Sequence, residues 1–207
     1  MPTGVAIREV RRQLFDAAER VLLRAGPSGL TSRAVTAEAG CAKGVLHRHF
    51  TDFDDFLAGL VEDRAAGIEA RASALRDRAG TGTVAGNLTG ALTDLFGTVA
   101  VAVVGLVAGR DGLRARLRRT RPTGVPLLAE AAAALADYLA AERDLGRLAP
   151  DADVDALAPA LIGAGHLLYA DRTGPAPTPE ALGRTVAAVV APWGPAGAGR
   201  PGARPQE

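Results

Sequence analysis

Side chains that can hold an anion by hydrogen bonds and charge are concentrated between Leu30 and Phe50, in the segment LTSRAVTAEAGCAKGVLHRHF. Hydroxyl, guanidinium, ammonium and imidazole groups donate to phosphate oxygens and to the edges of nucleic-acid bases. The donor side chains are those of Thr31, Ser32, Arg33, Lys43, His47, Arg48 and His49. This chemistry is recognition rather than catalysis, and it requires elements that present the donors on one surface.

The spacing of apolar residues supplies such elements. It predicts two short helices, 32–39 and 43–49, joined by a tight turn, which is the helix-turn-helix pattern. Gly40 stands where a left-handed backbone is needed, while Cys41 fills the turn and Leu46 faces inward. The outward face of the second helix suits insertion into a DNA major groove. That face is formed by Lys43, Gly44, Val45, His47, Arg48 and His49.

Other site chemistries do not fit this segment. His47 and His49 are two positions apart, so they point to opposite sides of a helix and cannot share a metal ion. Cys41 could sense redox state, but its place in the turn calls for a small buried side chain, and core packing is the favoured interpretation. Neither a Ser-His-Asp order nor a pair of carboxylates in an apolar setting stands out along the chain. We therefore expect no enzymatic activity, no metal and no cofactor.

Three further patterns resemble known sites but have simpler interpretations. Residues 80–85 match a dinucleotide-binding fingerprint, yet no strand precedes them, so a loop is expected. Asp151, Asp153 and Asp155 match half of a calcium loop whose later glycine and glutamate are missing, which leaves helix capping. The arginines of residues 114–121 could form a second nucleic-acid patch, although a solvated helix face is favoured over it.

Helices account for the whole of the predicted fold. Ala and Leu are abundant, β-branched residues are few, and no segment alternates as a strand does. We expect helices at 7–24, 32–39, 43–49, 53–79, 84–108, 111–119, 125–143, 152–172 and 179–193. The predicted fold class is therefore all-α, with a small N-terminal part and a larger helical body.

Composition and charge limit the partners. Hydrophobic residues form 48% and charged residues 23% of the 207-residue chain, so a packed core is expected. The net charge is only +1, but residues 1–51 carry eight basic and four acidic side chains, which favours a focused anionic partner. Cys41 is the only cysteine, so no intrachain disulfide can form. The most apolar run, 95–109, is shorter than the roughly 20 residues of a membrane span. With no secretory leader evident, we expect a cytoplasmic protein without membrane contact.

The N-terminal segment resembles the tetracycline-repressor (TetR) family of transcriptional regulators. The resemblance rests on an opening helix with Ala17-Ala18, the entry Gly29-Leu30-Thr31, the run AGCAKGVL and the closing His49-Phe50. Residues 146–155 also resemble the family's lead into its eighth helix. The motif covers about residues 8–60, and the rest of the chain matches as an all-helical body of suitable length.

The resemblance implies a division of the chain by role. Residues 1–52 would form a three-helix DNA-binding domain with a helix-turn-helix, and residues 53–193 a helical effector-binding and dimerisation domain. Residues 194–207 have no apolar anchor and are expected to be a disordered tail.

The resemblance also implies a homodimer. The last two helices, 152–172 and 179–193, would pair with those of a second copy in a four-helix bundle. The apolar surfaces around Leu161 and Val189 agree, because patches of that size are a liability on a monomer. Two-fold symmetry then predicts a roughly palindromic double-stranded DNA operator, read in successive major grooves.

Roles for the outward donors follow from the same resemblance. Phosphate contacts would come from Thr31, Arg33, Lys43 and His47. Val45 and Arg48 would lie nearer to base edges, where sequence is distinguished.

A pocket for a ligand is expected within the larger domain. Its candidate lining is Leu92, Leu95, Phe96, Val99, Val103, Leu117, Leu128, Leu135, Tyr138, Leu139, His166 and Tyr169. So few polar groups point to a lipophilic small molecule held by a handful of hydrogen bonds. Its binding would favour a conformation whose two recognition helices no longer match the groove spacing, which describes a repressor released by its effector.

Three positions depart from the family pattern. His47 stands where tyrosine is usual, Phe53 where a lysine commonly contacts phosphate, and Thr36 where alanine is usual. Negative charge beside Phe53 comes from Asp52, Asp54 and Asp55. A second interpretation therefore stays open, a helical small-molecule-binding or scaffold protein with weak or lost DNA binding. Steep salt dependence of DNA binding would favour the regulator.

Overall fold

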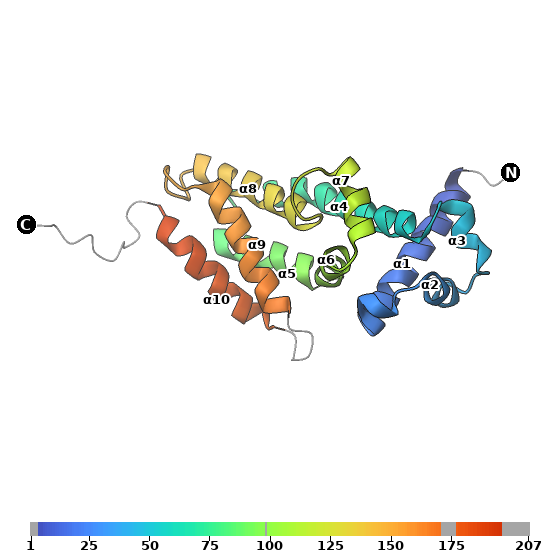
Figure 1. The fold of residues 1–207 in the computed structure, drawn as a ribbon. Coiled ribbons are helices and arrows are strands. Elements are labelled where there is room, and N and C mark those ends of the chain that lie inside the picture. The colour runs from blue at the N-terminus through green and yellow to red at the C-terminus, as the bar shows by residue number, and fades with distance from the viewer. Residues whose placement is uncertain (1–3, 98, 171–176, 196–207) are drawn as a thin grey trace, which may run out of the picture. The chain divides into compact units, whose positions relative to one another are not determined.

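The computed structural model describes residues 4–97, 99–170 and 177–195, with side chains from residue 8 onward (Figure 1). Within these residues the chain forms ten α-helices and one short 3-10 helix, and no strand. The elements are α1 (Gly4–Gly29), α2 (Ser32–Glu38), α3 (Gly44–His49), α4 (Phe53–Arg76), α5 (Val84–Phe96), α6 (Ala100–Ala108), α7 (Asp111–Thr120), α8 (Leu128–Asp144), α9 (Val154–Ala170), α10 (Pro179–Val190) and η1 (Ala191–Trp193). The predicted all-α fold is confirmed. Most of the predicted tail, from residue 196 on, lies outside the described residues.

The chain divides into two compact units. The first unit contains Met1–Ala66 and Val99–Leu127, and the second unit contains Gly67–Thr98 and Leu128–Glu207. Helix α4 thus contributes its first part to one unit and its last part to the other. The sequence predicted a functional boundary after residue 52, which differs from the boundaries of these two compact units. The functional boundary stays a prediction.

The core of the first unit forms where α1 packs against α2, α3 and α6. Phe15 of α1, Phe50 at the end of α3 and Phe56 of α4 bring three buried rings together. Their centroids are 5.8 Å (Phe15 to Phe50), 5.6 Å (Phe15 to Phe56) and 5.1 Å (Phe50 to Phe56) apart. Because aromatic pairs add about 0.5–1.5 kcal/mol beyond their burial, this cluster fixes where α3 ends and α4 begins.

Helix α1 runs past the end expected at residue 24. Gly26 interrupts it with a left-handed backbone (φ 69°, ψ −178°), and Pro27 begins one further turn that ends at Gly29. Glycine adopts this φ without a Cβ penalty, and proline suits the first turn of a helix. The expected stop is therefore present as a break inside α1.

The prediction of a single helix over 84–108 is wrong, because the structure has two helices, α5 and α6, separated at residues 97–99. Gly97 ends α5, and a Cβ at this position would lie 2.7 Å from the carbonyl oxygen of Thr93. Glycine followed by β-branched residues also has low helix propensity. The break assigns α5 to the second unit and α6 to the first.

The second unit is built from the last part of α4 together with α5, α8, α9 and α10. Helix α9 packs on α8, and α10 packs on both α5 and α9 (Figure 1). Gly165 of α9 allows close approach to α5, since a Cβ there would lie 2.5 Å from the ring of Phe96. Leu88, Leu92, Tyr138, Leu161 and Leu182 are fully buried or nearly so. Leu161 thus belongs to the core of the unit, and the prediction of an apolar surface around it is wrong, whereas Val189 is half-buried.

A buried carboxylate, Glu142, anchors the loop between α4 and α5. The residue is 0% exposed, and it accepts hydrogen bonds from the Tyr138 hydroxyl and from the Gly80 N–H at 3.2 Å. Arg147 lies 3.3 Å from its Oε2 and also donates to the carbonyl oxygen of Gly82 at 2.6 Å. Burial and the neighbouring Glu142 carboxylate raise the pKa of Tyr138, so the phenol stays a donor. Nothing in the sequence pattern indicated this network.

Among the described residues, no single helix is long and apolar enough to cross a membrane. Helices α5 and α6 reach the required length and hydropathy only when they are counted together across their break.

Candidate nucleic-acid interface and cavity

The helix-turn-helix forms at the predicted place. The hydroxyl oxygen of Thr31 accepts from the Ala34 N–H at 3.2 Å and so caps α2. Gly40 has a left-handed backbone (φ 66°), which turns the chain so that the Cys41 N–H donates to the carbonyl oxygen of Thr36 at 3.0 Å. Leu46 of α3 is fully buried. Helix α3, although only six residues long, is held in place by this packing and by the Phe50 cluster.

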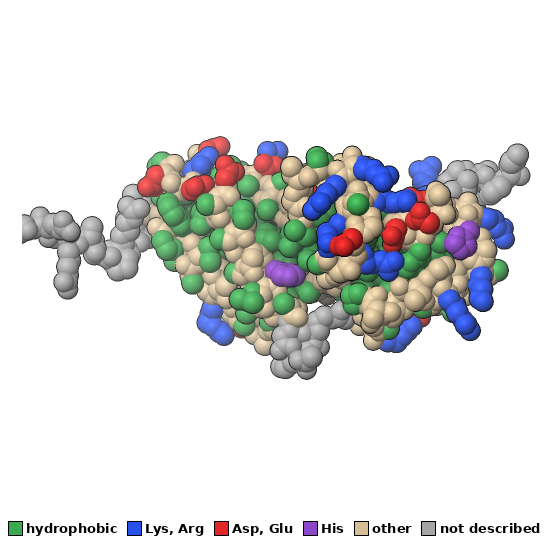
Figure 2. Space-filling view, viewed as in Figure 1, with side chains coloured by type: hydrophobic (Ala, Val, Ile, Leu, Met, Phe, Trp, Pro, Cys, Tyr) green, Lys and Arg blue, Asp and Glu red, His purple; other side chains and the backbone are tan. Residues whose placement is uncertain are grey.

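The expected DNA-contacting residues lie on the solvent side of the motif. The exposed ones are Thr31, Arg33, Lys43, Gly44, His47 and Arg48, and the half-buried ones are Ser32, Val45 and His49. Lysine and arginine side chains project around α2 and α3 together with a histidine (Figure 2). In the part of the chain that the structure describes, Arg33, Lys43 and Arg48 make no ion pair. These three charges are available to an external anion.

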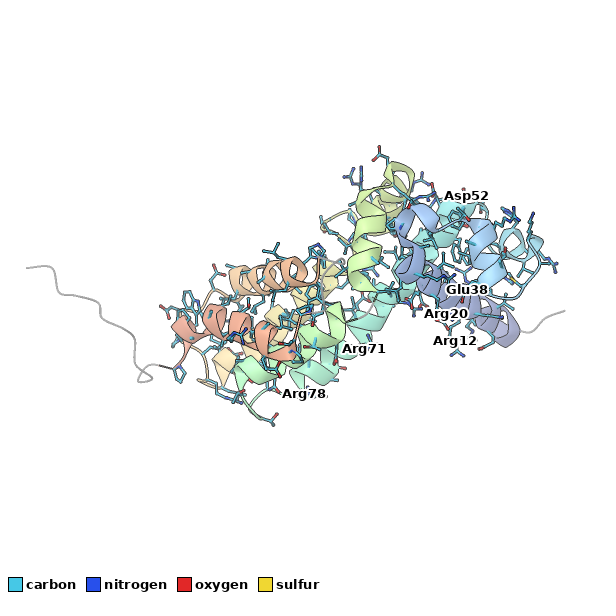
Figure 3. All side chains as sticks on the ribbon, turned by 90° about the horizontal axis from the view of Figure 1, so that it is seen from below. Arg12, Arg20, Glu38, Asp52, Arg71 and Arg78 are labelled. Carbon is cyan, nitrogen blue, oxygen red and sulfur yellow. The ribbon has the colours of Figure 1, made fainter. Side chains whose placement is uncertain are left out.

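Helix α1 holds the C-terminal end of α2, which sets the position of the motif. Arg20, whose side chain lies near that of Glu38 in Figure 3, has its Nε 2.7 Å from Glu38 Oε1. Arg24 Nη2 lies 2.9 Å from Glu38 Oε2. Hydrogen bonds from these two guanidinium groups lower the pKa of Glu38. Gln13 donates to the carbonyl oxygen of Ala39 at 2.9 Å. Arg20 and Arg24, which contribute to the positive charge of the N-terminal segment, are therefore engaged in ion pairs within the unit and not in the candidate DNA-binding surface.

Arginines of residues 110–116 compensate the acidic start of α4. Arg116 contacts Asp52 Oδ2 at 2.8 Å and Asp55 Oδ1 at 2.9 Å. Arg110 contacts Asp54 Oδ1 at 3.0 Å. The sequence suggested that Arg116 belongs to a solvated helix face. That prediction is wrong for Arg116, because its side chain contacts these carboxylates.

The same carboxylates cap α4. The Asp55 N–H donates to Asp52 Oδ1 at 2.7 Å, and the Thr51 N–H donates to Asp55 Oδ2 at 2.9 Å, which is a reciprocal capping arrangement. The bond from Thr51 and the contact with Arg116 lower the pKa of Asp55. Asp55 therefore stabilises the fold at neutral pH, and its contribution is lost as the pH falls through its lowered folded-state pKa.

The residues proposed for the pocket do not form one site. Val99, Val103 and Leu117 lie in the core of the first unit. In the second unit, Phe96 stacks on Tyr169 with centroids 5.8 Å apart and lies 6.1 Å from His166. Leu92, Leu95 and Leu135 line a cavity. The remaining three are Leu128, which is half-buried, and Tyr138 and Leu139, which are fully buried.

That cavity has a volume of about 190 Å³ and lies wholly within the second unit. Its apolar lining is Ile68, Ala72, Ala74, Leu75, Ala91, Leu92, Leu95, Ala131, Ala134, Leu135 and Ile162. Arg71, Arg78 and Asp94 complete the wall. The last part of α4 was missed as a source of lining residues, although Ile68, Ala72 and Leu75 recur there at helical spacing.

Residues 14–59 match the family model described as bacterial regulatory proteins of the tetR family. The match extends from α1 through the helix-turn-helix into α4. Residues 14–59 thus have the sequence pattern of the tetR family of regulatory proteins.

Solved structures of TetR-family regulators share the fold of nearly the whole chain. A Mesorhizobium loti protein assigned to the family is 17% identical with a TM-score of 0.67, and the alignment covers 93% of this chain and 100% of that one. Reduced NemR of E. coli is 17% identical with a TM-score of 0.69, over 90% and 98% of the two chains. FadR of Bacillus subtilis, in complex with stearoyl-CoA, is 18% identical with a TM-score of 0.61, over 87% and 96%. No curated protein matches the sequence.

The chain thus has the TetR-family regulator fold with an N-terminal DNA-binding domain, and the predicted recognition is confirmed. At these identities the solved structures establish the fold of this chain.

Arg116→Ala is expected to weaken DNA binding by about threefold to tenfold, because Asp52 and Asp55 would be left without their countercharge beside the TetR domain. The measurement is a titration of labelled duplex DNA with each variant at low salt. Arg119→Ala is the matched control, since Arg119 lies on the same helix and is exposed. Equal losses in both variants would mean that only total charge matters, and would contradict this role of Arg116.

Proposed function

We propose that the chain is a ligand-responsive transcriptional repressor, which binds a palindromic operator as a homodimer and is released by a lipophilic small molecule. The single observation that carries the proposal is the set of exposed donors on a packed helix-turn-helix, with Arg33, Lys43 and Arg48 unengaged in ion pairs among the described residues. Such groups bind phosphate and base edges. The chain would act in the cytoplasm and would not be an enzyme.

The proposed contacts are of two kinds, contacts to the DNA phosphates and contacts to the edges of the bases. Phosphates are assigned to Thr31, Arg33, Lys43 and His47, and the flanking Ser32, Gly44 and His49 lie on the same surface. The capping oxygen of Thr31 accepts from Ala34, which leaves its O–H free to donate to a phosphate. Arg48 and Val45 are assigned to base edges. Neutralising several phosphates releases counterions, so binding is expected to fall steeply with salt.

Dimerisation is assigned to α9 and α10, within the expected ranges 152–172 and 179–193; residues 171–176 lie outside the described part of the chain. Leu167 of α9 is 77% exposed, the largest exposure among the exposed large hydrophobic side chains of the described chain. The two helices pack side by side and so offer one continuous surface to a second copy. An isologous contact of this kind gives the two-fold symmetry that a palindrome requires.

The effector site is assigned to the cavity of the second unit. Its wall is mainly apolar, as expected for a lipophilic ligand. FadR of Bacillus subtilis, which has a similar fold, has been solved with stearoyl-CoA. Leu92, Leu95 and Leu135 are retained from the predicted lining. Effector binding would change DNA affinity through a coupling of about 1–3 kcal/mol.

A repressor is favoured over a helical scaffold that has lost DNA binding. The acidic cluster that kept this alternative open is paired with Arg110 and Arg116 and acts in capping α4. It therefore does not leave uncompensated negative charge beside the motif.

The test is the selection of bound fragments from randomised duplex DNA with the purified full chain at moderate salt. The expected product is a palindrome whose half-sites lie about one helical turn apart. A parallel selection with the Lys43→Ala, Arg48→Ala double variant is expected to recover no motif. Failure of the unaltered chain to enrich any motif at any salt concentration would overturn the proposed function.

A further inference from the structure

Two arginines stand at the wall of the apolar cavity in the second unit. Arg71 belongs to α4, and Arg78 lies two residues beyond its end, seven residues along the chain (Figure 3). Both side chains line the cavity together with Asp94 of α5, and all three residues are exposed, so their charges lie where the cavity meets solvent. The wall therefore combines hydrocarbon, contributed by side chains such as Leu75 and Leu92, with charge confined to three residues.

The two guanidinium groups are unused within the described chain. Neither Arg71 nor Arg78 makes a side-chain hydrogen bond or ion pair with the described residues, although both are close to the cavity. Arg147 of the same unit, by contrast, lies 3.3 Å from Glu142. The Arg78 guanidinium instead lies by Gly90, where a Cβ would be 3.8 Å from its Nη1. This places the Arg78 guanidinium within ordinary van der Waals reach of α5.

The charges of the wall favour an anion. Two arginines against one aspartate leave a net positive charge at a site whose remaining wall is apolar. Guanidinium groups bind carboxylate and phosphate oxygens by paired, charge-assisted hydrogen bonds. Asp94 opposes an anion placed beside it, so the headgroup is expected next to the two arginines.

We infer that the effector is an amphipathic anion, with its hydrocarbon part on the apolar wall and its acidic headgroup on Arg71 and Arg78. The inference rests on the proposed function, because it assigns a ligand class to the proposed effector site. The headgroup is a carboxylate or a phosphate, which share this recognition chemistry.

The test is a calorimetric titration of the full chain with four ligands of equal chain length: decanoate, decyl phosphate, decanol and decylamine. The anions are expected to bind about tenfold more tightly than decanol, which reports the apolar wall alone. The Arg71→Gln, Arg78→Gln double variant is expected to lose this preference while it keeps its affinity for decanol. Arg76→Gln is the control, because Arg76 lies between them in sequence and does not line the cavity.

Each other outcome has a distinct meaning. Equal binding of decanol and both anions would overturn the role of the arginines and leave the cavity as the effector site. Tighter binding of decylamine would overturn the inference in favour of a cation held by Asp94. Absence of binding by all four ligands would overturn the assignment of the effector to this cavity, and with it that part of the proposed function. A preference confined to one anion identifies the headgroup and supports the inference.

Discussion

Arg48→Ala is expected to lower affinity for the selected operator by about 1–3 kcal/mol, roughly 5- to 150-fold, and to relax sequence preference at one position of each half-site. Arg48 lies exposed on α3, and the described part of the chain offers its guanidinium no ion pair. Because the motif is packed through Leu46 and Phe50, removal of an exposed side chain should leave the fold intact. The measurement is a titration of the operator and of its single-base variants with each protein.

Lys43→Ala is the matched comparison for Arg48→Ala. Lys43 is also exposed, but it is assigned to phosphate, so its removal should weaken binding to all duplexes alike. The slope of log affinity against log salt concentration should become shallower by about one unit for each phosphate that is no longer neutralised. If Arg48→Ala also weakened all duplexes alike, its assignment to a base edge would be wrong.

Glu142→Ala is expected to lower the free energy of unfolding by about 3–5 kcal/mol, because it removes the acceptor at the centre of a buried network. The change would remove the hydrogen-bond acceptor of the Gly80 N–H and the countercharge of Arg147. The loop between α4 and α5 would lose its attachment to α8. Urea unfolding of the full chain, followed by circular dichroism, measures the effect.

Two further variants define the cause of this loss of stability. Asp144→Ala, at an exposed position two residues along α8, should change the free energy of unfolding by no more than about 0.5 kcal/mol. Glu142→Gln keeps an acceptor and the side-chain volume while it removes the charge, so an intermediate effect is expected. A decrease below about 1 kcal/mol in Glu142→Ala would show that the network does not hold the loop.

Local sequence signals were sufficient for the recognition motif. Thr31 caps α2 and Gly40 supplies the left-handed turn, as their residue types predicted. Hydrophobic periodicity likewise located most helices, because the apolar stripe of a helix is formed by residues that are close together in the sequence. The break near Gly97 was missed because the apolar run continues across it, so hydropathy alone did not mark the end of α5.

Local sequence signals did not predict the ion pairs between residues that are far apart in the sequence. Arg116 and Asp52 are 64 positions apart, and nothing in their local pattern distinguishes a paired arginine from a solvated one. Glu142 sits at a helix end, where a charged residue is ordinarily exposed. The pocket prediction failed to gather one site for a related reason: apolar type identifies core residues but does not say which of them border an empty volume. Arg71 and Arg78 were not considered because the predicted lining was chosen from apolar and aromatic residues, and exposed arginines at the edge of a cavity were not included.

The most direct test of the central claim is a titration of the full chain onto the selected palindrome and onto a shuffled duplex of the same composition, at several salt concentrations. The account predicts two chains per palindrome, a preference of about a thousandfold or more over the shuffled duplex, and a steep loss of affinity for both as salt rises. Equal affinity for the two duplexes, or no binding at the lowest salt concentration, would contradict it.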